Sequence, residues 1–259
     1  MDHKATLTTP DKIQIVGILS KAKKDNDKII VLCHGLTVDK DEDGIFRQLS
    51  ENLVENGFDC FRFDFRGHGE SGGKQEEMTI AGELTDLLTV VNFIKNKNYK
   101  KIGLLGASFG GGICALFSSF NKDAILALVL WNPVLDYSSW LFPKNNWHKK
   151  YFGQTAIERA EKFGFTEVGS RKFKLGIKLF NEIRFLKPYQ ELKKYKKPIL
   201  FVHGDKDSYV DYQESVRFSQ LLKAKLITIK DAEHGFQDKR EWQEKAINKT
   251  ISFFKKFIQ

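Results

Sequence analysis

The sequence lacks any long apolar run. Its longest run, residues 124–131, contains eight residues, whereas a helix that spans a bilayer needs about 20, so a membrane span is excluded. The first residues, MDHKATLTTPDK, contain no apolar stretch of the secretory kind. Only three cysteines occur, Cys33, Cys60 and Cys114, each in an apolar segment and without metal-type spacing. We therefore expect a cytoplasmic protein with reduced core cysteines and no metal.

Acidic residues are too few to balance the basic ones, and the imbalance is local. The chain holds 42 Lys and Arg against 33 Asp and Glu, a net charge of +9. Residues 137–197 alone hold 15 basic and 5 acidic residues, with 13 of the 33 aromatic residues. This stretch is either a solvated basic face over an apolar underside or a surface that attracts anionic substrates, acyl carriers or an anionic surface. Because no nucleic-acid-binding motif accompanies the charge, we expect no nucleic-acid partner.

Short apolar stretches alternate with helical patterns along the chain. Strands are predicted at residues 13–19, 28–33, 60–65, 101–105, 125–131, 198–203 and 225–229. Helices are predicted over residues 45–54, 80–94, 113–117, 212–222 and 242–258. This order is typical of an α/β protein whose mostly parallel sheet is covered on both faces. Since such sheets bind ligands at the carboxyl ends of their strands, residues directly after strands are the first candidates for a site.

The stretch Gly106-Ala107-Ser108-Phe109-Gly110 matches the G-x-S-x-G pattern of a nucleophile turn. It follows a predicted strand and precedes a helical pattern, as that turn requires. Small flanking residues let the strand and the helix approach closely, and the sharp turn exposes the Ser108 hydroxyl near the helix N-terminus. Ser108 is therefore the candidate nucleophile, with a glycine-rich turn and an incidental serine as the alternative.

A serine nucleophile needs a base to take its proton. In proteins with this turn, the acid and then the histidine follow the serine along the chain. Three histidines follow Ser108, of which His148 lies in the basic stretch and His203 precedes a turn as a structural residue. His234 lies directly after the last predicted strand and before the last predicted helix, so we predict that it is the general base.

The acid and the oxyanion donors are expected after strands as well. Asp207, in the loop after the strand at 198–203, is the candidate that orients the base; Asp205 suits the turn itself, and Asp211 is the second choice. The developing oxyanion needs two N–H donors. We expect these from the backbone of Phe109, which follows the serine, and of Leu36, in the loop after the strand at 28–33.

Five motifs together resemble the α/β-hydrolase superfamily. They are HGL at 34–36, DFRGHGES at 64–71, GASFGG at 106–111, HGDKDSYV at 203–210 and AEHGF at 232–236, in the order and spacing of that superfamily. The resemblance covers essentially the whole chain outside the basic stretch. Within the superfamily, the sequence resembles bacterial carboxylesterases of the cinnamoyl (feruloyl) esterase type, and also serine aminopeptidase-like hydrolases.

The resemblance implies an eight-stranded-type sheet, mostly parallel, with helices on both faces. It implies a hydrolase core from residues 1–133 and 198–259 and an inserted cap or lid at residues 134–197, which we call the cap segment. It also implies the triad of Ser108, Asp207 and His234, with Leu36 and Phe109 as the oxyanion hole.

We therefore expect a serine carboxylesterase that works through an acyl-enzyme on short-chain or aryl (cinnamoyl or feruloyl) esters, without a cofactor. Four aromatic residues of the cap segment, Trp140, Phe142, Trp147 and Phe180, either contact the substrate or pack the cap segment onto the core. A thioesterase or acyltransferase, and a serine peptidase on short peptides, are the alternatives because the same triad serves them. The complete triad argues against a non-catalytic ligand-binding protein. The expected partner is a small-molecule ester, and the sequence is compatible with a homodimer.

Overall fold

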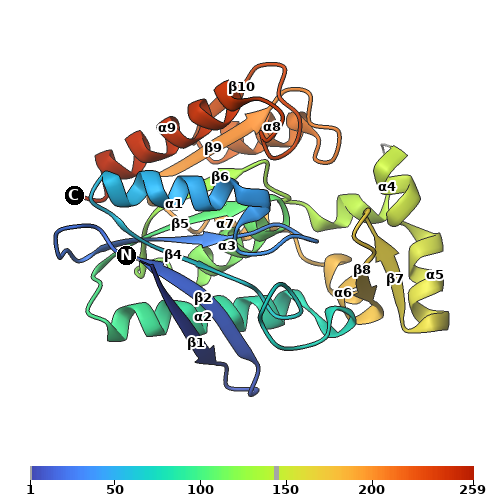
Figure 1. Ribbon diagram of the computed structural model, residues 1–259. Helices are drawn as coiled ribbons and strands as arrows, with labels where there is room; N and C mark the ends of the chain where they lie inside the picture. The colour runs from blue at the N-terminus through green and yellow to red at the C-terminus, as the bar shows by residue number, and fades with distance from the viewer. Residues whose placement is uncertain (1, 143–145) are drawn as a thin grey trace.

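The computed structural model describes residues 2–142 and 146–259, which form one large twisted sheet covered by helices (Figure 1). In spatial order the strands are β1 (Asp2–Thr8), β2 (Gln14–Ser20), β4 (Asp59–Phe63), β3 (Lys28–Cys33), β5 (Lys101–Ala107), β6 (Ile125–Trp131), β9 (Ile199–Gly204) and β10 (Lys225–Ile229). From β4 to β10 every pair is parallel, and β2 is antiparallel to both of its neighbours. The predicted α/β-hydrolase fold, with its mostly parallel eight-stranded sheet, is confirmed.

Strand β1 is the strand of this sheet that the sequence did not predict. Five of its seven residues are exposed because it lies at the edge of the sheet and pairs only with β2. It therefore lacks the regular alternation of apolar and polar residues that marks a half-buried strand.

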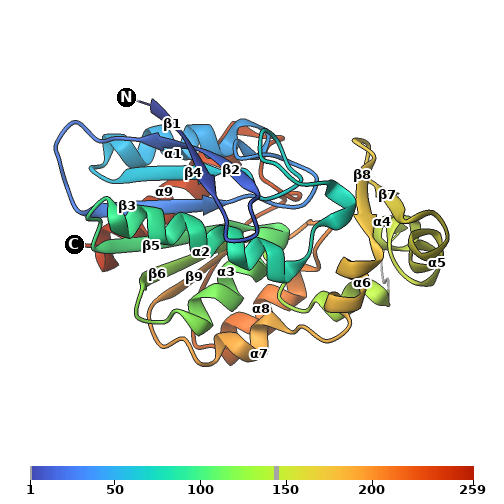
Figure 2. The ribbon, with the colours of Figure 1, turned by 90° about the horizontal axis from the view of Figure 1, so that it is seen from below.

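Helices cover both faces of the sheet (Figures 1 and 2). On one face lie α1 (Ile45–Glu55) and α9 (Arg240–Phe257), and on the other lie α2 (Ile80–Asn96), α3 (Ser108–Phe120) and α8 (Tyr212–Leu221). The side chains of β3 alternate between the two cores, with Val31 in the core under α2 and α3 and Leu32 in the core under α1 and α9. The three cysteines are free and fully buried, as predicted. None of the helices in the described part of the chain is long and apolar enough to cross a membrane.

The cap segment lies between β6 and β9 in the sequence. It contains η3 (Tyr137–Leu141), α4 (Asn146–Tyr151), α5 (Gln154–Phe163), the antiparallel pair β7 (Phe165–Val168) and β8 (Phe173–Gly176), α6 (Ile177–Ile183) and α7 (Pro188–Leu192). Both ribbon views place α4, α5, β7 and β8 beyond the carboxyl ends of the parallel strands (Figures 1 and 2). Helix α7 packs beside α3 instead. Most of the cap segment therefore lies over the end of the sheet where the candidate residues were predicted.

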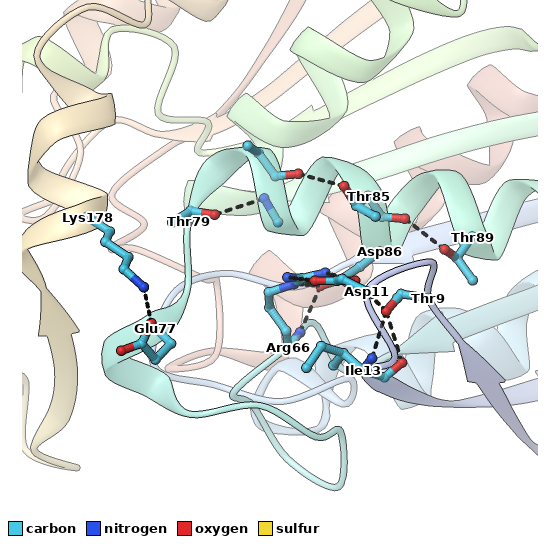
Figure 3. A network of polar contacts seen from close by, with 12 residues as sticks. Thr9, Asp11, Ile13, Arg66, Glu77, Thr79, Thr85, Asp86, Thr89 and Lys178 are labelled. Carbon is cyan, nitrogen blue, oxygen red and sulfur yellow. Dashed lines mark hydrogen bonds and ion pairs between the residues drawn. The ribbon is translucent and has the colours of Figure 1, made fainter.

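Ion pairs, one of them buried, hold the loop that connects β4 to α2. Arg66 of this loop donates to Asp86 of α2 at 2.7 Å and to Asp11, between β1 and β2, at 2.8 Å (Figure 3). The Asp86 side chain is fully buried, so removal of Arg66 would leave a buried charge without its partner. Lys178 of α6 pairs with Glu77 of η2 (Gln75–Glu77) in the same view. The loop is thus tied to the sheet edge, to α2 and to the cap segment.

Candidate active site

Ser108 lies where β5 ends and α3 begins, and its φ of +49° is in the left-handed region that non-glycine residues rarely adopt. Two glycines permit the close packing around it. A Cβ atom on Gly110 would lie 2.2 Å from the carbonyl oxygen of His34, and one on Gly106 would lie 2.5 Å from the carbonyl oxygen of Gly110. The GASFGG motif thus forms a tight strand–turn–helix unit that presents Ser108 at the carboxyl end of β5.

Asp207 and His234 meet across two neighbouring loops. Asp207 follows β9, His234 follows β10, and the Nδ1–H group of His234 donates to Oδ2 of Asp207 at 2.6 Å. Burial alone would raise the pKa of Asp207, but the charge of His234 and the hydrogen bonds from His203 and His234 hold it well below its usual range. Burial lowers the pKa of His234, and Asp207 outweighs this and raises it above its ordinary value. The pair therefore consists of an ionised carboxylate and an imidazole that readily accepts a proton.

Asp207 is held in place by donors from its own loop. The N–H groups of Tyr209 and Val210 donate to its Oδ1 at 2.9 and 2.8 Å, and Nε2–H of His203 donates to its Oδ2 at 3.1 Å. His203 is thus structural, as expected, but it also contacts the candidate acid. Of the other two acids considered, Asp205 accepts from the N–H group of Asp231 at 2.6 Å, and the Asp211 side chain caps α8. The structure therefore brings Asp207 to His234, whereas Asp205 accepts from a neighbouring loop and Asp211 caps a helix.

The loop after β3 lies beside Ser108. A Cβ atom on Gly35 would lie 3.2 Å from the Cβ atom of Ser108. His34 braces this loop because its Nε2 accepts from the N–H group of Phe65 at 3.0 Å and its Nδ1–H donates to the Gly35 carbonyl at 2.8 Å. Burial lowers the pKa of His34 to about 4, so its ring is neutral. The assignment of the Leu36 and Phe109 N–H groups as oxyanion donors stays a prediction, and Leu36 lines the cavity that Ser108 also lines.

A cavity of about 430 Å³ connects these elements. Ser108 and His234 line it together with Leu36 and with aromatic residues of the cap segment. The described residues that line it are Gly35, Leu36, Thr37, Val38, Glu42, Asp43, Ser108, Trp140, Trp147, His148, Tyr151, Gly169, Ser170, Arg171, Tyr209, Val210, His234, Gly235 and Gln237. The hydrolase core therefore supplies the candidate reacting groups, and the cap segment supplies much of the wall.

The four cap aromatics predicted to contact substrate differ in position. Trp140 and Trp147 line the cavity. Phe142 is 75% exposed and Phe180 is fully buried, with its ring centroid 6.4 Å from that of Phe152, and neither lines the cavity. The spacing of aromatic residues in the sequence does not show which of them face a cavity. The structure therefore distinguishes two residues that line the cavity from two that do not, although nothing in the sequence distinguishes them.

Several polar residues at the cavity were not predicted. Glu42, in η1 (Glu42–Gly44), is buried, and its Oε2 accepts from the Gly35 N–H group at 2.6 Å. Arg171, between β7 and β8, pairs with Asp43 and donates to the Thr37 carbonyl at 3.1 Å. Each belongs to a run of polar residues that resembles an ordinary solvated loop, so the sequence contains no signal that distinguishes them.

One further histidine lines the cavity. His148 of α4 is buried, and this burial lowers its pKa to about 4. Its ring centroid lies 5.7 Å from that of Trp140 and 5.3 Å from that of Trp147, so it packs among the cap aromatics. Across residues 2–142 and 146–259, no group of three or more His, Cys, Asp and Glu side chains is arranged to hold a metal ion.

Comparison with known sequences finds a family and relatives that match large parts of this chain. The serine aminopeptidase S33 family matches residues 24–166. YfhR of Escherichia coli O157:H7, an uncharacterized protein, is 25% identical over 215 residues, which cover 77% of this chain and 63% of YfhR. An acyl transferase of Shewanella woodyi is 31% identical over 118 residues, which cover 44% of this chain and 37% of the transferase. The chain thus spans less than two thirds of the length of these curated relatives.

Comparison with solved structures shows the same fold over nearly the whole chain. Est1E from Butyrivibrio proteoclasticus, solved with ferulic acid bound, is 26% identical and has a TM-score of 0.77. The superposition covers 98% of this chain and 99% of Est1E. The similarity therefore includes the cap segment as well as the sheet.

Proposed function

This chain belongs to the serine aminopeptidase S33 family of α/β-hydrolases, and we propose that it is a carboxylic-ester hydrolase with Ser108, His234 and Asp207 as its catalytic triad. The observation that carries the proposal is the 2.6 Å hydrogen bond between His234 and Asp207 at the wall of the cavity that Ser108 lines. A serine in a strained turn, with an acid-oriented imidazole at the same cavity, provides the parts that acyl transfer needs.

In the proposed reaction, Ser108 Oγ attacks the ester carbonyl carbon while Nε2 of His234 takes the hydroxyl proton. The oxyanion that forms accepts hydrogen bonds from the N–H groups of Leu36 and Phe109. When the intermediate collapses, the C–O bond to the alcohol breaks, and the alcohol leaves with the proton from His234. Water then attacks the acyl-enzyme by the same route and restores Ser108.

The charges around His234 suit this proton transfer. Because the pKa of Asp207 lies well below its usual range, Asp207 remains an anion throughout the reaction. It therefore stabilises the imidazolium form of His234 that exists while the oxyanion is present. The Nδ1–H group is fixed on Asp207, which leaves Nε2 as the nitrogen that exchanges the proton.

The walls of the cavity favour an aryl or short acyl group. Ring contacts run from the base into the cap segment, since the Tyr209 centroid lies 5.3 Å from that of His234 and 5.0 Å from that of Trp147. Trp140 and Tyr151 extend this aromatic wall. We propose that it stacks against an aryl acyl group, and the ferulic acid bound to Est1E supports this choice.

The basic charge of the cap segment contributes little to the cavity itself. Arg171 is the one Lys or Arg among the described lining residues, and it is paired with Asp43. Glu42 adds an acidic group to the lining, which further offsets the positive charge of Arg171. We therefore propose a neutral ester as substrate, rather than an anionic one that would need an unpaired cation.

Acyl transfer to a second acceptor is the alternative that a specific observation favours. The Shewanella woodyi relative bears the name acyl transferase, and the first half-reaction of a hydrolase and of an acyltransferase is the same. The two differ in what resolves the acyl-enzyme, water or an alcohol or thiol. Addition of such an acceptor should leave the rate of ester cleavage unchanged in a hydrolase and should yield no acylated acceptor.

The test is hydrolysis of p-nitrophenyl acetate, butyrate and octanoate and of methyl ferulate by wild type, Ser108→Ala and Ser118→Ala. Ser118 lies on the same helix but is fully buried away from the cavity, so it is a control for loss of a serine hydroxyl from α3. We expect loss of several orders of magnitude in kcat for Ser108→Ala and none for Ser118→Ala. Near-wild-type turnover by Ser108→Ala, or equal loss in both variants, would overturn the assignment.

A further inference from the structure

A second large hollow lies at the opposite end of the sheet from the candidate active site. It has a volume of about 1150 Å³ and is formed by residues of 193–200, 221–227 and 249–257, which we call the basic groove. These residues precede or begin β9 and β10 and include the carboxyl-terminal half of α9. In Figure 1 the chain end beside α9 and the helices α4 and α5 lie on opposite sides of the molecule.

The charge of the basic groove is of one sign. Seven lysines line it, Lys193, Lys196, Lys197, Lys223, Lys225, Lys249 and Lys256, and none of the described lining residues is an aspartate or glutamate. In the part of the chain that the structure describes, none of the seven forms an ion pair. Six of them are exposed and Lys197 is partly buried. The groove therefore presents a dense positive charge that no acidic side chain of residues 2–142 and 146–259 neutralises by an ion pair.

The floor of the basic groove is apolar. Leu222, Ile227 and Phe253 line it, and two large side chains at its border remain accessible, Leu221 at 47% and Phe257 at 37%. Lysine side chains around such a floor can lay their methylene stems on it while their ammonium groups reach outward. The combination suits a partner that carries anionic groups next to hydrocarbon.

We propose that the basic groove docks this protein on the surface of a membrane that contains anionic phospholipids. Phosphate headgroups complement the lysines, and the upper parts of the acyl chains complement the apolar floor. A second copy of this chain fits poorly, because a twofold contact would bring seven lysines against seven. A nucleic-acid backbone would match the charge but would leave the apolar floor without a partner.

The orientation leaves the candidate active site accessible. The groove lies at the amino ends of β9 and β10, whereas Asp207 and His234 follow their carboxyl ends. A protein docked through the groove would therefore present its cavity to the water. The proposal does not depend on which ester, if any, the cavity hydrolyses.

The experiment is co-sedimentation of the full chain with vesicles of phosphatidylcholine alone and of phosphatidylcholine mixed equally with phosphatidylglycerol. The groove variant carries Lys196→Glu, Lys225→Glu and Lys249→Glu. The control variant carries Lys149→Glu, Lys150→Glu and Lys162→Glu, three exposed lysines of the cap segment, so both variants have the same net charge. Circular dichroism and thermal melting show whether each variant is folded.

Wild type and the control variant should bind the anionic vesicles and release them at high salt, because salt shortens the range of the attraction. The groove variant should bind them about tenfold or more weakly. No vesicle binding by wild type, equal binding to both vesicle types, or undiminished binding by the groove variant would each overturn the proposal. Loss of binding in the control variant as well would show a general charge effect, and groove-dependent binding of a DNA duplex without vesicle binding would assign the surface to nucleic acid; both results reject membrane docking.

Discussion

Replacement of Glu42 by glutamine tests how much stability the protein loses when Glu42, the second buried carboxyl group of the candidate site besides Asp207, ionises. The Glu42 side chain is buried, and its Oε2 accepts from the N–H group of Gly35 at 2.6 Å. Burial raises the pKa of Glu42 to about 7, although the hydrogen bond from Gly35 and the charge of His234 both lower it. Glutamine keeps an oxygen acceptor for the Gly35 N–H group and removes the charge. The variant therefore isolates the free energy that ionisation of Glu42 costs the folded protein.

The magnitude follows from the two pKa values. The ordinary pKa of a glutamate is 4.5, and that of folded Glu42 is about 7. Between these values the folded state binds more protons than the unfolded state, so wild-type stability falls as the pH rises through this window. The full difference corresponds to about 3 kcal/mol. Because Glu42→Gln lacks this titration, its stability relative to wild type should rise by about 2 to 3 kcal/mol between about pH 5 and about pH 8.

Urea denaturation of both proteins at the two pH values, followed by tryptophan fluorescence, measures the difference. Glu51→Gln removes an exposed glutamate of α1 and serves as the control for the loss of one charge. Its effect on the free energy of unfolding should be the same at both pH values. If the effect of Glu42→Gln is also independent of pH, the burial argument for Glu42 is refuted.

Three further predictions concern the site. Asp207→Asn should lower kcat by a factor on the order of 10⁴ and move the rising limb of the kcat/KM profile to lower pH, because Asp207 raises the pKa of His234; an unmoved limb would contradict this. Gly110→Ala should lower the urea midpoint, at a cost of about 1 to 3 kcal/mol or more, because its Cβ atom would collide with backbone atoms; an unchanged midpoint would show that the turn can relax. Trp147→Ala should raise KM for methyl ferulate, whereas Phe142→Ala should not, because Phe142 does not line the cavity.

The sequence predicts the candidate residues of the site because the ends of the strands are clearly marked. Buried parallel strands such as β5 and β9 are short, mostly apolar runs that lead into glycine-containing turns. The side chains that follow them must meet at one edge of the sheet. The sequence therefore predicts Ser108, Asp207 and His234 at one edge of the sheet, and in the structure Asp207 lies against His234 at the cavity that Ser108 lines.

The polar part of the cavity could not be predicted in the same way. Glu42 belongs to the run DKDED at 39–43, whose composition indicates a solvated loop. Its burial depends on a local turn, in which Glu42 and Asp43 have φ values of +45° and +54°, that folds the carboxylate back under Gly35. No periodic pattern reports such a turn. The positions of the aromatic residues of the cap segment could not be predicted for a related reason. Their exposure depends on how short helices pack and not on their spacing in the sequence.

The two buried carboxyl groups near His234 differ in the donors and charges that surround them, and this difference sets their pKa values. Asp207 accepts four hydrogen bonds, two from N–H groups and two from histidine rings, whereas the Glu42 side chain accepts one in the described part of the chain. Burial raises the pKa of both groups, but the charge of His234 and the hydrogen bonds from both histidines hold that of Asp207 well below its usual range. The hydrogen bond from Gly35 and the charge of His234 do not offset the burial of Glu42, so its pKa stays raised. At neutral pH His234 therefore interacts with a permanent anion and with a carboxyl group that is partly protonated. Glu42 raises the pKa of His234, and His234 lowers the pKa of Glu42. The pH profile of kcat/KM for wild type should therefore contain two coupled titrations. Glu42→Gln should reduce the profile to one titration with a lower midpoint, because His234 then lacks one of the charges that raise its pKa.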